Sequence, residues 1–359
     1  MRAMINKQAG INVAHSLTEK NPTQVPYWIP TGSRWLDSII SRGEMAGIPG
    51  SKISELAGLA STGKSYMAAQ VAANAQKMGI DVFYFDSESA IDPEFLKNAG
   101  CNLDELMYIQ AMSVEFVLET IETLLASNNN RMLFIWDSLA LTPAISDIEG
   151  DFNPQSSMAV KARILAKGLS KLIIPIANSE STFLILNQLK ANITRSPSEA
   201  MTTPYMTPGG KATIYSYSLR IWLTGRKAKA SFVTDDKGFR VGSEVKVKLE
   251  KSRFGTQGRQ CNFKILWGDK IGIQDDESLF DAISSSESLK RLGAWYELHD
   301  TDGKALGSKF QSTKWTDRMK DDVFRQRVYE IMDEEIIFKF DKRLGNASDF
   351  YEEKQEVGN

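Results

Sequence analysis

The chain has 359 residues, of which 42% are hydrophobic, and its 43 Lys and Arg nearly balance its 45 Asp and Glu. This composition predicts a folded globular protein and excludes an intrinsically disordered chain. The net charge of −2 argues against an electrostatic grip on nucleic acid over the whole surface. Any such binding must therefore come from local clusters of basic and polar groups.

The chain has two cysteines and two histidines, and none of them stands at the spacing of a metal site. A structural zinc site and a disulfide framework are therefore both unexpected, which fits a reducing compartment. The first 24 residues contain no apolar stretch of signal-peptide length, and no run has the length of a membrane span. We expect a soluble cytoplasmic protein without a membrane partner.

Four segments are predicted along the chain. Residues 1–28 are mostly polar and predict an arm or short helix before the main domain. In residues 29–274, short apolar runs first alternate with amphipathic stretches, which predicts an α/β fold with a parallel sheet covered by helices on both faces. From Leu219 the pattern becomes strand-rich and predicts an antiparallel extension. Residues 275–345 predict a small C-terminal α/β domain, and residues 346–359 predict a mobile tail.

The expected strands of the parallel sheet are Ile53–Ala57, Asp81–Asp86, Met107–Gln110, Met132–Asp137 and Thr182–Asn187. The expected helices between them are residues 64–78, 113–127 and 156–178. The expected strands of the extension are residues 219–224, 230–234, 239–250 and 261–267. Ligands of parallel sheets bind beyond the carboxyl ends of the strands, so the functional site is sought there.

The expected first strand leads into Gly58-Leu-Ala-Ser-Thr-Gly63-Lys64-Ser65, which matches the phosphate-binding pattern G-x-x-x-x-G-K-[ST]. The glycines let backbone N–H groups surround phosphate oxygens, and the next helix adds the positive end of its dipole. Lys64 would bridge the β- and γ-phosphates, and the Ser65 hydroxyl would ligate Mg²⁺. The alternative is a glycine-rich turn without a nucleotide, which the flanking strand and helix disfavour. The expected nucleotide-binding residues here are Gly58, Ser61, Thr62, Gly63, Lys64, Ser65 and Tyr66.

Two acids follow other strands at the same expected edge of the sheet. Asp137 ends an apolar strand and would hold the Mg²⁺ shell together with Ser65. Glu88 follows the strand Asp81–Asp86, where it can orient and deprotonate the water that attacks the γ-phosphate. The residues alone do not decide between this base and a solvated loop carboxylate, or an acid at the start of the helix that Asp92 would cap.

Several phrases in collinear order resemble those of RecA recombinases. They are Pro30-Thr-Gly32-Ser33, Asp86-Ser-Glu88-Ser-Ala-Ile-Asp92-Pro93, Trp136-Asp137-Ser138-Leu-Ala-Leu-Thr142-Pro143, Ile148-Glu149-Gly150, Leu186-Asn187-Gln188, Thr207-Pro-Gly209-Gly210-Lys211 and Gly293-Ala-Trp-Tyr296. The run Glu250-Lys251-Ser252-Arg253 is similar to that of phage UvsX recombinases. The phrases span roughly residues 30 to 300, and a P-loop shared with unrelated ATPases would not produce this order.

The resemblance implies roles in ATP turnover for the matching residues. With Lys64 on the phosphates, Glu88 becomes the catalytic base, and Gln188 becomes the sensor that reports the γ-phosphate to the DNA side. Lys251 and Arg253 would reach the ATP of a neighbouring subunit, as an arginine finger does. Without the resemblance, a solvated pair at a strand end would be favoured. The residues placed around the adenine are Asp92, Phe95 and Trp267, of which either aromatic can instead belong to the core.

Two long polar loops, residues 150–157 and 189–210, resemble the two DNA-binding loops of RecA. Basic side chains and the backbone of two glycines would contact phosphates, and two apolar side chains would wedge between bases. The candidates are Met158, Arg163, Lys190, Ile193, Arg195, Gly209, Gly210 and Lys211. The first loop is one residue longer than in bacterial RecA, and Ser170 stands where that family has a basic residue.

The resemblance therefore implies a RecA-type P-loop ATPase that uses ATP and Mg²⁺. Its subunits would polymerise on single-stranded DNA, pair it with homologous double-stranded DNA and exchange strands. Residues 1–28 would contact a neighbouring subunit, and a mediator and a single-strand-binding protein would be further partners. A phage-encoded protein would work in the host cytoplasm. The alternatives are a RecA-core hexameric DNA helicase or motor and a non-hydrolysing nucleotide-binding regulator.

Overall fold

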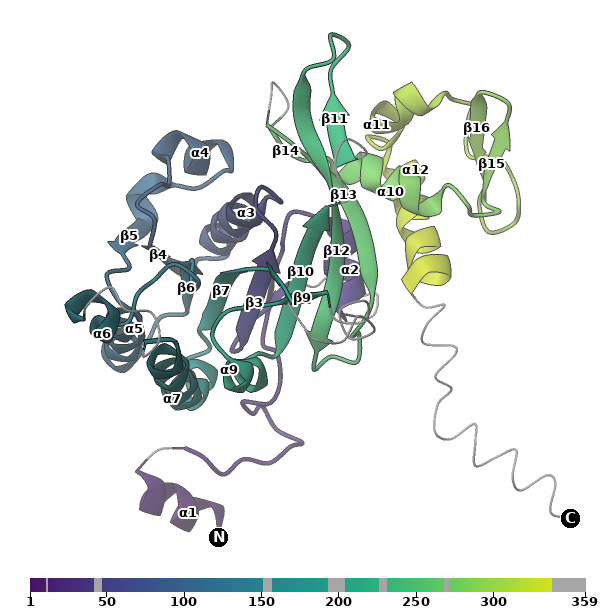
Figure 1. Cartoon of the computed structure of the whole chain (residues 1–359). Coiled ribbons are helices and arrows are strands. Elements are labelled where there is room, and N and C mark those ends of the chain that lie inside the picture. The colour runs from purple at the N-terminus through teal and green to yellow at the C-terminus, as the bar shows by residue number, and fades with distance from the viewer. Residues whose placement is uncertain are drawn as a thin grey trace, which may run out of the picture.

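The computed structural model describes residues 1–10, 12–41, 47–150, 157–192, 204–225, 231–267 and 271–337. Its central feature, within these ranges, is a sheet of ten strands (Figure 1). In order across the sheet they are β14 (Gly272–Ile273), β13 (Gln260–Leu266), β12 (Arg240–Ser252), β10 (Leu219–Gly225), β3 (Ile53–Gly58), β7 (Thr182–Gln188), β6 (Met132–Asp137), β4 (Asp81–Asp86) and β5 (Leu106–Gln110). A further strand, β11 (Phe232–Thr234), pairs with β12.

The sheet has a parallel part and an antiparallel part. All neighbouring strands from β10 to β5 are parallel. Beyond β10 the pairs are antiparallel. Strands β3, β6 and β7 are buried almost throughout, as expected for parallel strands covered on both faces. The predicted parallel sheet with an antiparallel extension is confirmed, and its strand ends lie within two residues of the predicted ones.

Helices cover both faces of the sheet (Figure 1). On one face, α2 (Arg34–Ser41) and α3 (Lys64–Lys77) pack into a large apolar core. On the other, α5 (Val114–Ser127) and α7 (Ser157–Asn178) form a second core with the sheet. The shorter elements are α1 (Arg2–Ala9), β1 (Trp28–Ile29), β2 (Ile48–Pro49), α4 (Pro93–Asn98), α6 (Ile145–Glu149), β8 (Lys190–Ala191), β9 (Tyr205–Met206) and α9 (Lys211–Ser216). Among the helices of the described ranges, none combines the length and the apolar composition needed to cross a membrane.

The C-terminal elements have an apolar core of their own. They are α10 (Asp275–Ile283), β15 (Leu289–Leu292), β16 (Trp295–Leu298), α11 (Trp315–Arg318), α12 (Asp322–Ile331) and η4 (Met332–Ile337). The rings of Phe310, Trp315 and Phe324 contact one another at its centre in tilted and edge-to-face arrangements. Trp35 of α2 packs against both this core and that of the sheet. The boundaries of the four predicted segments stay predictions, and residues 346–359 lie outside the described residues.

Two carboxyl groups, one buried and one half-buried, lie where α2 meets α10. Asp37 accepts hydrogen bonds from the backbone N–H of Thr31 at 3.1 Å and from its hydroxyl at 2.7 Å. Asp275 accepts one from the backbone N–H of Arg34 at 2.9 Å. Burial raises the pKa of Asp37 to about 8, and the nearby Asp275 adds to this rise. Burial likewise raises the pKa of Asp275 to about 6. At neutral pH Asp37 therefore favours the protonated form in the folded protein, whereas Asp275 remains mostly ionised.

We predict that Asp37→Asn flattens the pH dependence of stability. The folded pKa of Asp37 lies above its ordinary value of 3.8. Its stabilising contribution is therefore complete below that value and is lost as the pH rises through about 8. The free energy of unfolding of the wild type, relative to the variant, should fall between about pH 5 and pH 8 in urea titrations. Substitution of the exposed Asp236 by Asn is the control. Parallel pH profiles of the wild type and Asp37→Asn would contradict the prediction.

Candidate nucleotide site and adjoining loops

The loop after β3 turns tightly into the start of α3. Ser61 and Gly63 adopt positive φ angles of 58° and 81°. A Cβ atom on Gly63 would lie 2.3 Å from Cδ1 of Ile265, and one on Gly58 would lie 2.6 Å from Oγ1 of Thr62. Both positions therefore require glycine. The turn leaves the free backbone N–H groups at the start of α3 around one small space, which is a cradle for an anion.

A hydroxyl, a carboxylate and an ammonium group meet at the carboxyl ends of β3 and β6. Oγ of Ser65 donates a hydrogen bond to Oδ2 of Asp137 at 2.8 Å. The hydroxyl of Tyr84 donates to the same oxygen at 2.9 Å. Nζ of Lys64 donates to the carbonyl of Leu59 at 2.9 Å, within the loop itself. Hydroxyl and carboxylate oxygens are the ligands that Mg²⁺ prefers, so Ser65 and Asp137 fit such an ion.

Glu88 lies on a turn that Asp86 organises. Asp86 is buried at the end of β4, and its carboxylate also accepts a hydrogen bond from the hydroxyl of Tyr108 at 3.3 Å. Since α4 begins only at Pro93, Glu88 is not an acid of its first turn. The Asp86 carboxylate accepts hydrogen bonds of 2.9 to 3.3 Å from four backbone N–H groups, those of Glu88, Ser89, Ala90 and Ile91.

Burial and neighbouring charges shift the pKa of Glu88, Asp137 and Lys64. Burial raises the pKa of Glu88, and the carboxylates of Asp137 and Asp86 raise it further, against Lys64. Burial also raises the pKa of Asp137, against the hydrogen bonds that it accepts. Burial lowers the pKa of Lys64, and the two carboxylates Asp137 and Glu88 oppose this change. Negative charge therefore already accumulates here, and a phosphate ligand would need the cradle, Lys64 and a divalent cation together.

Two adjoining cavities lie over this loop. The larger has a volume of about 640 Å³ and reaches from the loop to α4 and the β12–β13 hairpin. The smaller, of about 410 Å³, is lined by Ser65, Asp86, Glu88 and Asp137 among others. The predicted nucleotide residues that line the larger cavity are Ser61, Thr62, Gly63, Lys64, Ser65, Tyr66, Asp92, Phe95 and Trp267. The structure thus brings the predicted phosphate and adenine residues together around one cleft, with Glu88 at its side.

Sequence analysis had not selected three side chains of this cleft. The hydroxyl of Tyr84 and the carboxylate of Asp86 hold Asp137 and the Glu88 turn, as described above. The guanidinium of Arg240 lies 4.9 Å from the ring centre of Trp267, at the mouth of the larger cavity. Asp86 carried a usable signal, because it ends an apolar strand as Asp137 does. Tyr84 and Arg240 carried none, since their partners are remote in sequence.

Gln188 is the last residue of β7, and in the sheet register it lies opposite Gly58, the first glycine of the phosphate loop. The next residue, Leu189, donates its backbone N–H to the carbonyl of Gly58 at 3.0 Å. The predicted phosphate sensor is therefore beside the phosphate loop on one side. On the other side it continues directly into the second polar loop.

The second polar loop has a short antiparallel stem. In β8 and β9, Lys190 lies opposite Met206. The backbone N–H of Asn192 donates to the carbonyl of Pro204 at 2.9 Å. The predicted polar loop over residues 189–210 therefore has a short strand pair near its two ends, which the prediction did not include. Strands of two residues show no alternation, so the sequence pattern could not reveal them.

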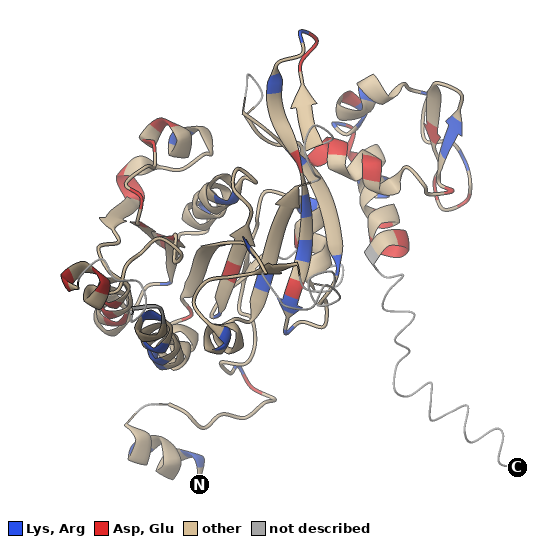
Figure 2. Ribbon diagram, in the orientation of Figure 1, with Lys and Arg blue, Asp and Glu red and all other residues tan. Residues whose placement is uncertain are grey.

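The structure describes in full five of the eight predicted DNA-contacting residues, namely Arg163, Lys190, Gly209, Gly210 and Lys211. The side chains of Arg163, Lys190 and Lys211 are exposed. Gly209 and Gly210 have positive φ angles of 110° and 82° just before α9. A Cβ atom on Gly210 would lie 3.2 Å from Cβ of Ala162, so the start of α9 touches α7. Figure 2 shows Lys and Arg on both of these helices. Ile193, Arg195 and the side chain of Met158 lie outside the described residues.

Lys251 and Arg253 lie at the opposite edge of the sheet. Lys251 is in register with Arg220, near the start of β10, and Arg220 is in turn in register with Glu55 of β3. The phosphate loop begins at Gly58, three residues further along β3, which is roughly 10 Å along the strand. Nζ of Lys251 donates to the carbonyl of Ile214 at 2.6 Å, and Nη2 of Arg253 donates to that of Tyr215 at 2.9 Å. The two cations thus cap the carboxyl end of α9. Burial, together with the charges of Arg253 and Arg220, lowers the pKa of Lys251 to about 8.

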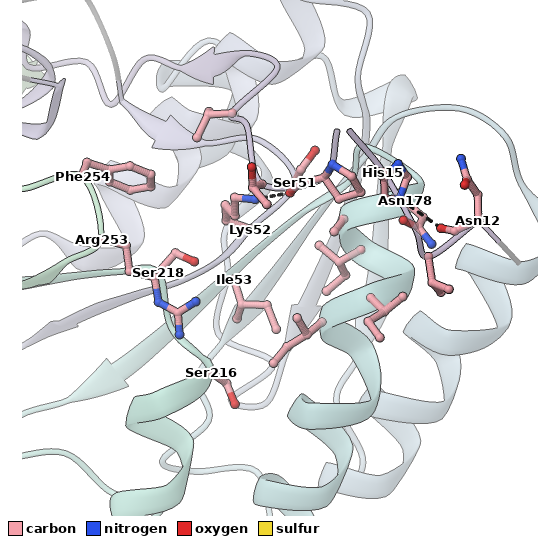
Figure 3. Close-up of a pocket in the computed structure, with 18 residues that line it drawn as sticks. Asn12, His15, Ser51, Lys52, Ile53, Asn178, Ser216, Ser218, Arg253 and Phe254 are labelled. Carbon is pink, nitrogen blue, oxygen red and sulfur yellow. Dashed lines mark hydrogen bonds between the residues drawn. The ribbon is translucent and has the colours of Figure 1, made fainter. Parts of the chain in front are cut away.

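Arg253 also lines a cavity of about 750 Å³ at this edge (Figure 3). The start of β3, the end of α7 and the N-terminal arm form its other walls. Lys52 belongs to this lining, and its Nζ donates to the carbonyl of Pro22 in the arm at 2.7 Å. Positive charge therefore gathers at the edge of the sheet that faces away from the nucleotide cleft.

The fold and the loop together define a class of protein. A parallel sheet carries a glycine-rich phosphate loop between a strand and a helix. The acid that ends β6, which β7 separates from β3, lies within hydrogen-bonding distance of the loop serine. This arrangement defines a P-loop nucleotide-binding protein.

Comparisons with known proteins give the family. The family model described as RecA N-terminal domain matches residues 2–272, and the chain belongs to the RecA family. It is similar to Protein RecA of Fusobacterium nucleatum, with 33% identity over 83% of this chain and 74% of that protein. It is also similar to Protein RecA of Saccharopolyspora erythraea, with 30% identity over 89% and 87% of the two chains. It is similar as well to Protein RecA of Chlamydia caviae, with 28% identity over 92% of this chain and 90% of that protein. The RecA resemblance is confirmed, whereas these bacterial relatives give no support to the predicted phage origin.

We predict that Asp86→Asn loosens the turn that carries Glu88. The amide keeps the shape of the side chain but offers a single acceptor oxygen. Some of the four backbone N–H groups that bond to Asp86 therefore lose their acceptor. Amide hydrogen exchange of residues 88–91, followed by mass spectrometry, should become about tenfold faster. Asp81→Asn, at the other end of β4, is the matched control. Unchanged exchange over residues 88–91 would show that another contact holds the turn.

Proposed function

We propose that this RecA-family protein is a DNA-dependent ATPase that polymerises as a helical filament on single-stranded DNA. The filament catalyses homologous pairing and strand exchange in recombination and repair. Family membership and the RecA relatives support this proposal. One structural observation carries it: Lys251 and Arg253 lie at the edge of the sheet opposite the nucleotide cleft. In a head-to-tail stack, this edge of one copy faces the cleft of the next, and a contact that does not close produces a helix.

The cleft fits ATP and Mg²⁺. The two glycines that tolerate no Cβ leave room for phosphate oxygens at the backbone. Lys64 leaves its carbonyl partners in the loop to neutralise the β- and γ-phosphates, and the aromatic ring of Trp267 offers a face to the adenine. Ser65 would hold Mg²⁺ directly and Asp137 through water, and the bound ion would neutralise charge on the phosphate oxygens.

Glu88 is the general base in this proposal. Its carboxylate takes a proton from the water that attacks the γ-phosphate. The hydrogen bonds to Asp86 fix the turn on which it lies, so the base keeps one position relative to Asp137. The raised pKa of Glu88 brings its basicity closer to neutral pH, which strengthens it as a base. Gln188 at the end of β7 senses the γ-phosphate and reports its loss.

Lys251 and Arg253 act on the nucleotide of the neighbouring copy. They leave the carbonyl groups of α9 and contact the γ-phosphate across the interface, where they stabilise the charge of the transition state. Because α9 follows directly after Gly209 and Gly210, this contact also ties assembly to the DNA-binding side. Contacts with the sugar-phosphate backbone make DNA binding insensitive to sequence and weaker at high salt. The cations Arg163, Lys190, Arg195 and Lys211 supply these contacts, together with the backbone of Gly209 and Gly210. Met158 and Ile193 wedge between bases.

We predict that Glu88→Gln abolishes turnover and keeps assembly. The amide retains the size and hydrogen-bonding shape of the side chain but cannot accept the proton, so phosphate release should fall by about 10²- to 10⁴-fold. Filaments on single-stranded DNA should still form with ATP, as seen by electron microscopy. Glu94→Gln, in the wall of the same cleft, should hydrolyse ATP as the wild type does. Turnover at the wild-type rate in Glu88→Gln would exclude this base.

We predict that Lys251→Ala abolishes ATP-dependent filaments and spares nucleotide binding within one subunit. The variant should bind a fluorescent ATP analogue with wild-type affinity, because Lys251 is remote from its own cleft. Negative-stain images with single-stranded DNA and a non-hydrolysable analogue should show filaments for the wild type and for Lys246→Ala, an exposed control on the same strand. Filaments of Lys251→Ala would exclude the contact across the interface. Closed rings of the wild type would favour the hexameric motor instead.

A further inference from the structure

A buried polar cluster connects the strand of the phosphate loop with the exit of the second polar loop. Its members are Glu55 on β3, Arg220 on β10, Asn187 on β7 and Thr207 after β9, and we name it the Glu55 cluster. Glu55 and Asn187 are fully buried, and Arg220 is 5% exposed. Nε of Arg220 donates to Oε2 of Glu55 at 2.6 Å, and its Nη2 donates to Oγ1 of Thr207 at 2.9 Å. The guanidinium group thus holds the core carboxylate with one nitrogen and the loop exit with another.

Asn187 makes a second connection of the same kind. Its Nδ2 donates to Oε1 of Glu55 and to the carbonyl of Pro208, both at 3.0 Å. Its Oδ1 accepts the backbone N–H of Gln188 at 2.9 Å. Both carboxylate oxygens of Glu55 are therefore used. Residues 207 and 208, immediately before the two glycines, are each tied to strands that end at the nucleotide cleft.

Apolar contacts follow the same course. Tyr205 in the stem packs with Leu59, the second residue of the phosphate loop, against the small core of Ala57, Leu189 and Trp222. The stem of the second loop therefore rests on the end of β3 itself. Polar and apolar contacts together leave little freedom for the loop exit to move independently of the phosphate loop.

The Glu55 cluster is a poor device for stability alone. Taking an ion pair out of water costs several kcal/mol per ion, and well-packed hydrophobic residues of similar volume often stabilise a core as well or better. The cluster instead fixes the orientation of its members, because the planar guanidinium group of Arg220 holds Glu55 and Thr207 at the same time. A shift of the Gln188 backbone changes the acceptor geometry of Asn187, and hence the position of the Pro208 carbonyl.

We propose that Arg220 and Thr207 are positioning residues that transmit the state of the nucleotide to the DNA grip. When Gln188 engages the γ-phosphate, the Glu55 cluster holds residues 207–208, and with them Gly209 and Gly210, in the arrangement that grips DNA. Without that contact the loop exit relaxes and DNA affinity falls. This inference rests on the proposed function and adds to it the residues through which the two sites are coupled.

Two variants test the inference from its two ends. Thr207→Val keeps the shape of a half-buried side chain but removes the acceptor of Arg220. Arg220→Lys keeps a cation beside Glu55 but loses the second donor of the fork. Affinity for a fluorescent oligo-dT is measured by anisotropy with a non-hydrolysable ATP analogue and with ADP, and DNA-free ATP turnover is measured alongside. The ratio of the two affinities should fall at least about fivefold in each variant. DNA-free turnover should stay at the wild-type level.

The double variant and a control sharpen the test. Arg220→Lys combined with Thr207→Val should lose no more coupling than either change alone, because both remove one contact. Thr224 lies on β10, as Arg220 does, and its hydroxyl donates to the carbonyl of Lys246 on β12 at 3.3 Å. The Thr224→Val variant should behave as the wild type. Should Arg220→Lys fail to fold, Thr207→Val decides alone.

Three outcomes would overturn the inference, and they differ from one another. If Thr207→Val keeps the wild-type ratio of DNA affinities in the two nucleotide states, the Arg220–Thr207 contact does not transmit the nucleotide state. If Thr207→Val loses DNA affinity equally in both nucleotide states and Arg220→Lys does not, Thr207 is instead a residue that contacts DNA directly. A wild type whose DNA affinity does not depend on the nucleotide contradicts the proposed function itself, whatever the variants do.

Discussion

Parallel strand pairing is the constraint on which the rest of the molecule depends. Because five neighbouring strand pairs from β10 to β5 run in one direction, the strands must deliver their carboxyl ends to one edge. Gly58, Asp86, Asp137 and Gln188 end four different strands, and that edge is the place where they meet. The phosphate loop alone would be a short anion cradle. The sheet supplies Asp137, Glu88 and Gln188, which surround it.

The same pairing also creates an opposite edge, and the antiparallel strand β12 places Lys251 and Arg253 there. A rigid sheet cannot bring its two edges together, so these cations cannot serve the cleft of their own subunit. Under the proposed function, the ATP site is complete only between two copies, and α9, which the pair caps, begins beside the DNA-binding glycines. Assembly, nucleotide state and DNA grip thus share a small number of contacts.

Buried carboxyl groups recur through the fold, and each is satisfied by a different chemistry. Glu55 pairs with an arginine, Asp86 accepts four backbone N–H groups, and Asp137 accepts two hydroxyl groups. At the junction with the C-terminal elements, burial raises the pKa of Asp37 to about 8, so that acid is satisfied largely by retaining its proton. The carboxyl groups around the nucleotide cleft are thus held by directional hydrogen bonds, whereas Asp37 is held largely by its own proton.

The sequence by itself determined the order of strands and helices, the phosphate loop and two acids at or just after strand ends, Asp137 and Glu88. These features are local, because contiguous residue types set backbone conformation and strand burial, and collinear phrases such as Leu186-Asn187-Gln188 identified the family. Only the tertiary structure decided which remote groups meet. Glu55 and Arg220 are 165 residues apart, Ser65 and Asp137 are 72 apart, and no local pattern encodes such pairs. They arise from strand register, which is settled only when the whole sheet packs its two cores.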